Sequence, residues 1–269
     1  MKRIAVCSWI WLAASALMEG QLSVPQLGVA HYADGSVHVV RGIAANLIVD
    51  SRTIATADSA SFSDSAGLIA ARGVIRLIRT DGTVLGEYQS GEAQPVLNID
   101  PLAQFAAVWL PSKHLLLSWN GRQFVETPIE DSSFAGRVMS ISVASSTSAQ
   151  FLVGRADSSV ARISVSLPSG RVTNSDTAPG AHRQVIAQQG WIVSQDDLGL
   201  TAERADGSRQ TMALSTHAIP VGDLTMERMS DHWLHVFSRS ASTDWAIEVT
   251  ATKLSIFLLP VPVAGEAAR

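Results

Sequence analysis

Apolar and polar residues alternate over short stretches of about four to six residues through most of the chain, and turn-forming pairs separate these stretches. Alternation with a period of two is typical of half-buried β-strands. The clearest turns are Asp34-Gly35, Asp81-Gly82, Asn120-Gly121, Ser169-Gly170 and Asp206-Gly207, and a weaker one lies at 250–252. Glycine, and to a lesser degree Asn or Asp, accepts the positive φ of tight hairpin turns. The pattern therefore predicts a series of β-hairpins with almost no helix.

A second set of short turns lies before each of the later hairpins, so that strands come in groups of four. Residues 95–128 illustrate the unit: strands are predicted at 96–99, 105–110, 114–119 and 123–127. The second of these is continuously apolar, which is typical of a strand covered on both faces. The fourth is more polar, as expected for an exposed edge. Similar units are predicted at 60–88, 137–173, 183–214 and 225–259.

A unit of four strands that returns about every forty residues predicts an all-β protein with the fold of a β-propeller. The N-terminal unit is incomplete: it has a hairpin around Asp34-Gly35 and an apolar stretch at 47–49, with no strand pair before them. A six-bladed ring would use these segments as a reduced first blade. A five-bladed ring would carry the hairpin as an extra piece. We favour six blades.

One segment resembles a known repeat. Residues 60–70, Ala-Ser-Phe-Ser-Asp-Ser-Ala-Gly-Leu-Ile-Ala, are similar to the pattern of WD40-like and related bacterial propellers, in which a Phe-Ser-Pro-Asp-Gly turn precedes a strand of small residues. The Gly-His and Trp-Asp dipeptides of true WD40 repeats are absent at the expected places. The resemblance is to bacterial secreted β-propellers of unknown function, and it implies the fold without an activity.

The first twenty residues have the features of a secretory signal peptide. Lys2 and Arg3 precede an uncharged, mostly apolar run at 4–18, and Ala14-Ser15-Ala16 supplies small residues for cleavage. We therefore expect a signal peptide at 1–20, a single propeller domain at 21–269, and a secreted or periplasmic location. An uncleaved N-terminal anchor is the alternative. The only cysteine is Cys7, so the mature chain would have no thiolate ligand or nucleophile.

The charge pattern bears on the partners that we expect. The net charge of −4 becomes −5 once Lys2, Arg3 and Glu19 are removed, and charges of both signs are spread along the chain. There is no basic stripe typical of nucleic-acid binding and no polybasic membrane patch. We expect a monomer whose partner is a protein, peptide or glycan, with no membrane contact after signal cleavage.

Two sequence features suggest metal ligands on first inspection. His232 and His235 flank two residues of a predicted strand, where an odd separation sends side chains to opposite faces, so we interpret them as structural or surface histidines. Asp196-Asp197 has the oxygen ligands that Ca²⁺ prefers. No calcium-loop motif surrounds this pair. Ca²⁺ is therefore a cofactor that the chain could bind but that no sequence motif supports.

Carboxylates at the inner ends of blades are the remaining catalytic candidates. Paired carboxylates catalyse glycoside hydrolysis, and the candidates by position are Asp58, Asp64, Asp100 and Asp231. A divalent cation in the central channel would be held by Asp64, Asn98 and Asp100. No Gly-x-Ser-x-Gly nucleophile motif is present. No single residue can be assigned a catalytic, cofactor or metal role from these patterns.

Tryptophans are a further class of binding candidate because exposed rings stack on sugars and peptides. Trp109, Trp191 and Trp233 lie in predicted second strands, so we expect them to pack between blades. Trp119, beside the Asn120-Gly121 turn, is the tryptophan that we expect nearest the outer rim.

These observations favour a secreted, non-catalytic propeller that serves as a binding or scaffold module. The alternative is a propeller hydrolase or lactonase with a cation-dependent site in the central channel. A propeller hosts either function, because the fold alone does not determine the activity.

Overall fold

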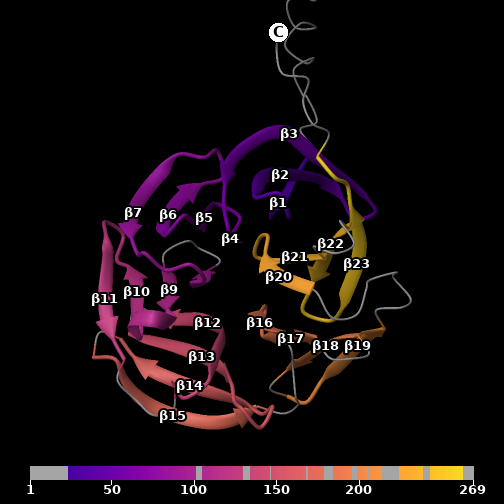
Figure 1. The fold of residues 1–269 in the computed structure, drawn as a ribbon. Helices are drawn as coiled ribbons and strands as arrows, with labels where there is room; N and C mark the ends of the chain where they lie inside the picture. Colours follow the sequence, from indigo (N-terminus) through magenta and orange to yellow (C-terminus); the bar gives the residue numbers. More distant parts are fainter. Residues whose placement is uncertain are drawn as a thin grey trace, which may run out of the picture.

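The computed structural model describes residues 24–100, 105–129, 134–145, 147–167, 169–178, 184–195, 199–204, 206–213, 224–238 and 243–262. These residues form a ring of six antiparallel sheets, or blades, around a central channel (Figure 1). The predicted signal peptide at 1–20 lies outside the described residues and stays a prediction. Within the described part of the chain, no helix is long and apolar enough to cross a membrane.

Five blades have four strands each, and each blade is one continuous segment of chain. Blade 2 comprises β4 (Ser59–Phe62), β5 (Ala66–Ala71), β6 (Val74–Arg79) and β7 (Val84–Gln89). Blade 3 comprises β8 (Val96–Ile99), β9 (Ala106–Leu110), β10 (Leu115–Trp119) and β11 (Phe124–Pro128), with a 3-10 turn at Pro111–Lys113. Blade 4 comprises β12 (Arg137–Ser145), β13 (Ser148–Gly154), β14 (Val160–Ser166) and β15 (Arg171–Ala178). The predicted units therefore match these blades closely.

The last two complete blades follow the same order. Blade 5 comprises β16 (Gln184–Gln188), β17 (Trp191–Gln195), β18 (Gly199–Arg204) and β19 (Arg209–Ala213). Blade 6 comprises β20 (Leu224–Arg228), β21 (Trp233–Ser238), β22 (Thr243–Val249) and β23 (Leu254–Leu259). In every complete blade the first strand lies nearest the channel and the fourth lies outermost (Figure 1). The predicted turn glycines all have positive φ: Gly35, Gly82, Gly121, Gly170 and Gly207.

Blade 1 has three strands, β1 (Gln26–His31), β2 (Ser36–Ile43) and β3 (Asn46–Thr56), and β3 includes the apolar stretch at 47–49. The reduced first blade of a six-bladed ring is thereby confirmed. A four-stranded blade returns the chain to the face from which it started, and a three-stranded blade does not. For that reason β1 runs opposite to the inner strands of the other blades.

Contacts with blade 6 show which strand is missing. The Val29 amide donates to the Met229 carbonyl at 2.9 Å, whereas His31 contacts Glu227, so β1 is antiparallel to β20. It contacts β21, a second strand, and β3 contacts the outermost strand β23. Blade 1 therefore lacks the innermost strand within the described residues, and β4 and β20 contact each other directly in its place (Figure 1).

The orientation of blade 1 changes the meaning of the first predicted turn. Asp34-Gly35 connects the second and third strand positions of its blade, whereas the other four predicted turns connect the third and fourth. Its counterpart in blade 2 is the Arg72-Gly73 turn. The interval between Asp34-Gly35 and Asp81-Gly82 thus does not measure one blade, although both pairs form tight turns for the same backbone reason.

The apolar core is divided among the six junctions between neighbouring blades, one cluster at each junction. Trp109, Trp191 and Trp233 lie in second strands and are at most 6 % exposed, which confirms their predicted packing between blades. Trp119 does reach the outer part of blade 3. Its ring is nevertheless buried against Gly86 of β7 and Phe124, so it presents no open face for stacking on a ligand.

The Gly86–Trp119 contact predicts a size-dependent loss of stability. A β-carbon at Gly86 would overlap the six-membered ring of Trp119. We expect Gly86→Ala to lower the free energy of unfolding by about 1–3 kcal/mol, a typical cost of overpacking. In a Trp119→Phe background the same substitution should cost clearly less, because the overlapping ring atoms are gone. Chemical denaturation measures both, with exposed Leu85→Ala as a control; an equal cost in the two backgrounds contradicts the prediction.

Candidate functional site: the central channel

The central channel contains a pocket of about 730 Å³. Its walls are the inner strands β4, β8, β12, β16 and β20. Its mouth lies on the face that carries the connections between blades, here called the connection face. Residues of those connections line the mouth, together with His114 of the turn between β9 and β10: Asp58, Glu92, Gln94, Phe134 and Gly136. Its deep end is lined by Ser61, Asn98, Ser140, Ala187 and Arg228.

Arg228 crosses the channel at the deep end of the pocket. Its Nη1 donates to the Ile99 carbonyl of blade 3 at 2.6 Å, and its Nη2 donates to the Ala187 carbonyl of blade 5 at 2.7 Å. Burial lowers the pKa of the guanidinium to about 10, and the charges of Asp231 and Asp100 act in the opposite direction. Arg228 is therefore a cation at neutral pH that forms the floor of the pocket.

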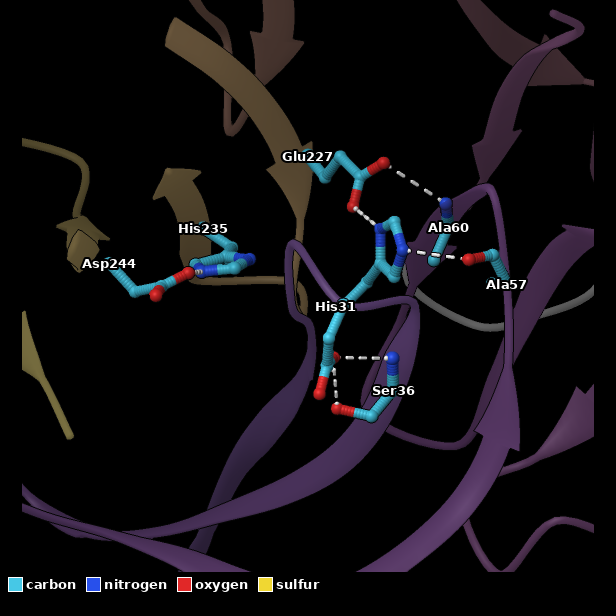
Figure 2. A network of polar contacts seen from close by, with 8 residues as sticks. His31, Ser36, Ala57, Ala60, Glu227, His235 and Asp244 are labelled. Carbon is cyan, nitrogen blue, oxygen red and sulfur yellow. Dashed lines mark hydrogen bonds and ion pairs between the residues drawn. The ribbon is translucent and has the colours of Figure 1, made fainter. Parts of the chain in front are cut away.

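Glu227, the neighbour of Arg228 in β20, joins blade 6 to blades 1 and 2 (Figure 2). Its Oε2 lies 2.8 Å from Nδ1 of His31, and its Oε1 accepts the amide of Ala60 at 3.1 Å. His31 Nε2 donates to the Ala57 carbonyl at 3.0 Å, because a carbonyl can only accept. The two side chains are only 4 % and 10 % exposed. Glu227 thus lines the pocket, and its two carboxylate oxygens link blade 6 to blades 1 and 2.

A second histidine–carboxylate pair lies behind the pocket, at the junction of blades 6 and 1. His235 Nε2 lies 2.8 Å from Asp244 Oδ1, and both side chains are buried (Figure 2). The imidazole of His235 stacks on Phe237 and lies beside the ring of Tyr32. Tyr32 donates to the Pro260 carbonyl, and burial together with the nearby Asp244 strongly raises the pKa of its phenol. This pair is enclosed in the junction and serves packing.

On the far side of Arg228, at the other mouth of the channel, two carboxylates approach each other. The backbone amide of Asp231 donates to Oδ1 of Asp64 at 3.3 Å. Burial and the charge of Asp64 raise the pKa of Asp231 to about 6, although Arg228 and His232 favour its ionised form. Among the described residues, the buried Oδ1 of Asp231 has no hydrogen-bond partner. The approach of Asp64 and Asp231 brings together residues that are 167 positions apart.

The other sequence-based candidates are dispersed. Asp58 lies at the opposite end of β4 from Asp64, and its Oδ2 accepts the Arg72 amide. Asn98 lines the pocket, and Asp100 accepts the Phe105 amide. Within the described residues, no group of three or more His, Cys, Asp or Glu side chains is arranged to hold a metal ion. Asp196-Asp197 lies outside those residues.

The two histidines singled out in the sequence do separate as expected. His232 is exposed in the turn before β21, whereas His235 is buried within that strand. The pair that the sequence did not suggest, Glu227-Arg228, carries the contacts in the channel. The sequence feature that could have indicated this pair is its position. Two charged residues lie between the apolar Met226 and Met229, in a segment predicted to be an inner strand.

The His31–Glu227 contact predicts a coupled loss of stability. Glu227→Ala leaves His31 and the Ala60 amide without this partner, and we expect a loss of about 3–5 kcal/mol, as for other broken buried pairs. His31→Ala should cost a similar amount, and the double variant should cost clearly less than the sum. Thermal and chemical denaturation measure the three variants, with His232→Ala, whose side chain is exposed, as control. Additive losses would show that the two side chains act independently.

The raised pKa of Asp231 predicts a pH-dependent effect of its replacement. Between the ordinary pKa near 3.8 and about 6, the folded state retains a proton that the unfolded state has lost, so stability falls as pH rises through this window. Asp231→Asn removes the penalty. We expect the variant to be more stable than the native protein at pH 7.5, by roughly 1–2 kcal/mol, with the advantage disappearing below about pH 4.

The matched control for this measurement is Asp206→Asn. The Asp206 carboxylate accepts hydrogen bonds from Ser208, which lowers its pKa. This substitution should therefore reduce stability above the ordinary pKa, and the loss should disappear only below the lowered pKa of the folded state. Melting curves across pH 4–7.5 compare the two variants. A lower stability of Asp231→Asn at pH 7.5 would contradict the prediction.

Comparison with known proteins shows the fold and no family. No family model and no curated protein sequence matches the chain. Among solved structures, it is similar to a protein of unknown function from Bacteroides caccae (TM-score 0.55, 14% identity, covering 91% of this chain and 96% of that one). It is also similar to a chain of a nidogen/laminin complex (TM-score 0.55, 10% identity, covering 87% of this chain and 93% of that one).

A third similar structure is a mutant of the Aleuria aurantia lectin in complex with alpha-methyl-L-fucoside (TM-score 0.52, 10% identity, covering 88% of this chain and 91% of that one). At such identities the likeness shows a shared architecture alone. The chain is a six-bladed β-propeller, and the fold is consistent with a binding or scaffold module at that coarse level.

Proposed function

We propose that this protein is a secreted, non-catalytic binding module that takes a segment of a protein, peptide or glycan partner into the channel pocket from the connection face. The observation that carries the proposal is the pocket of about 730 Å³ with a fixed floor at Arg228. Ligand sites in proteins are typically preformed concave pockets of roughly 300–1,000 Å³ with a few placed polar groups. Export rests on the predicted signal peptide at 1–20.

Three carboxylates of the lining are held in place by hydrogen bonds, as a preformed recognition surface requires. Glu227 is bonded through both oxygens, and Asp58 accepts the Arg72 amide. Glu92 accepts both the amide and the hydroxyl of Ser112. These carboxylates stabilise the blades and their connections. A rigid recognition surface needs groups that stay in place, because ordering them on binding would cost affinity.

The alternative function is a hydrolase or lactonase with a channel site that uses a divalent cation. The meeting of Asp64 and Asp231 at the far mouth is the observation in its favour. Asn98, the amide ligand expected from the sequence, lines the deep end of the pocket. It therefore lies on the other side of Arg228 from Asp64 and Asp231. Turnover of lactones, esters or glycosides that is removed by Asp64→Ala and restored by Ca²⁺ after chelation would replace the binding proposal.

The binding proposal predicts that filling the pocket abolishes recognition. Half-buried Thr225 lines the pocket, so Thr225→Trp should occupy space that a ligand needs. We expect purified residues 21–269 to bind members of a glycan array or a peptide library and the Thr225→Trp variant to lose that binding at least tenfold. Thr173→Trp, on the exposed strand β15, should bind as the native protein does. Equal loss in both variants, or no ligand in either library, counts against the proposal.

A further inference from the structure

Arg228 forms no ion pair with any described residue, although its guanidinium lies deep in the channel. Its two bonded partners are the neutral carbonyls of Ile99 and Ala187. Asp231 and Asp100 act on it at longer range, from the far side of the channel. A cation removed from water without an opposite charge in contact is costly. The structure keeps such a cation at the floor of the channel pocket.

The guanidinium also retains donors. Arginine carries five N–H groups, and the two bonds of Arg228 to carbonyls use one hydrogen on each of two nitrogens. The residue lines the pocket and is only half-buried overall, so it can be reached from the connection face. A planar guanidinium with donors to spare favours a carboxylate, which it binds through parallel charge-assisted hydrogen bonds.

The walls indicate what the carboxylate is attached to. Inner strands present their free edges to the channel, and the side chains of β20 already bind three of those edge groups: the Ala60 amide and the Ile99 and Ala187 carbonyls. An extended peptide offers backbone donors and acceptors that complement a free strand edge. The free strand edges can pair with the backbone of a peptide, and the guanidinium at the floor can pair with a carboxylate. The C-terminal end of a peptide chain offers both groups.

We propose that the channel pocket receives the free C-terminus of an extended peptide, with its terminal carboxylate bound to Arg228. This inference rests on the proposed function and specifies its ligand. Other charged groups face the same space. Glu227 is bonded to His31 and the Ala60 amide, and Asp100 and Asp231 lie beyond the guanidinium. At the mouth, Asp58 accepts the Arg72 amide, Glu92 accepts from Ser112, and Arg137 is exposed. Arg228 is therefore the cation that a carboxylate meets at the floor.

The test uses pooled acetylated tetrapeptides, each present as a free acid and as its C-terminal amide. The pool is passed over immobilised residues 21–269, and retained peptides are identified by mass spectrometry. We expect free acids to be retained about tenfold or more over their amide twins, because the amide lacks the charge that strengthens the contact. Equal retention of acids and amides overturns the inference. The comparison needs no variant of the protein.

Three variants locate the carboxylate. Arg228→Met should remove the preference for acids, with near-ultraviolet circular dichroism to verify its fold, since Arg228 also joins blades 3 and 5. Asp231→Asn keeps Arg228 and removes an opposing charge, so it should increase retention of acids severalfold at pH 7.5. Arg171→Met, on the exposed strand β15, is the matched control. Loss of the preference in Arg137→Met with retention in Arg228→Met would place the carboxylate at the rim and overturn the inference.

The two proposals fail in different ways. If Thr225→Trp abolishes binding of some ligand but acids and amides are retained equally, the binding function stands and the carboxylate inference falls. If neither the peptide pool nor the arrays yield a ligand sensitive to Thr225→Trp, the binding function itself falls.

Discussion

Two consecutive residues of one inner strand hold the centre of this propeller together. Adjacent side chains of a strand point in opposite directions, so Glu227 reaches towards blades 1 and 2 and Arg228 reaches across the channel to blades 3 and 5. Each of these bonds pairs one of the two side chains with a backbone group or with an imidazole nitrogen. Buried polar groups need such partners, and these two side chains, which both line the pocket, supply them.

The reduced first blade and the Glu227 contacts are parts of one arrangement. Because the described residues include no inner strand in blade 1, β4 and β20 are neighbours, and a carboxylate accepts the amide of Ala60. His31 then fills the space between the strands and fixes the orientation of Glu227. The ring is thus closed by side chains and by the Val29–Met229 backbone bond. Each blade is still built from one continuous segment.

The blades were predictable because their signals are local. Gly82 and Gly121 require positive φ whatever the rest of the chain does, and the apolar second strands reflect cover on both faces. The orientation of blade 1 was not predictable, because Asp34-Gly35 has the same local chemistry as the later turns. The roles of Glu227 and Arg228 were not predictable for a related reason. In the sequence, two charged residues at the end of a strand resemble solvent-exposed residues, and their partners lie on distant blades.

The three strands of blade 1 also determine where the two ends of the described ring lie. The chain enters β1 from the face opposite to the pocket mouth, and it leaves β23 on the connection face, where Tyr32 bonds with Pro260. The two ends of the described ring therefore emerge on opposite sides. β23 is the outermost strand of blade 6, so the chain leaves the described ring at the outer rim of the connection face, away from the central mouth (Figure 1). An odd number of strands in blade 1 thus places the two ends of the described ring on opposite faces of the disc.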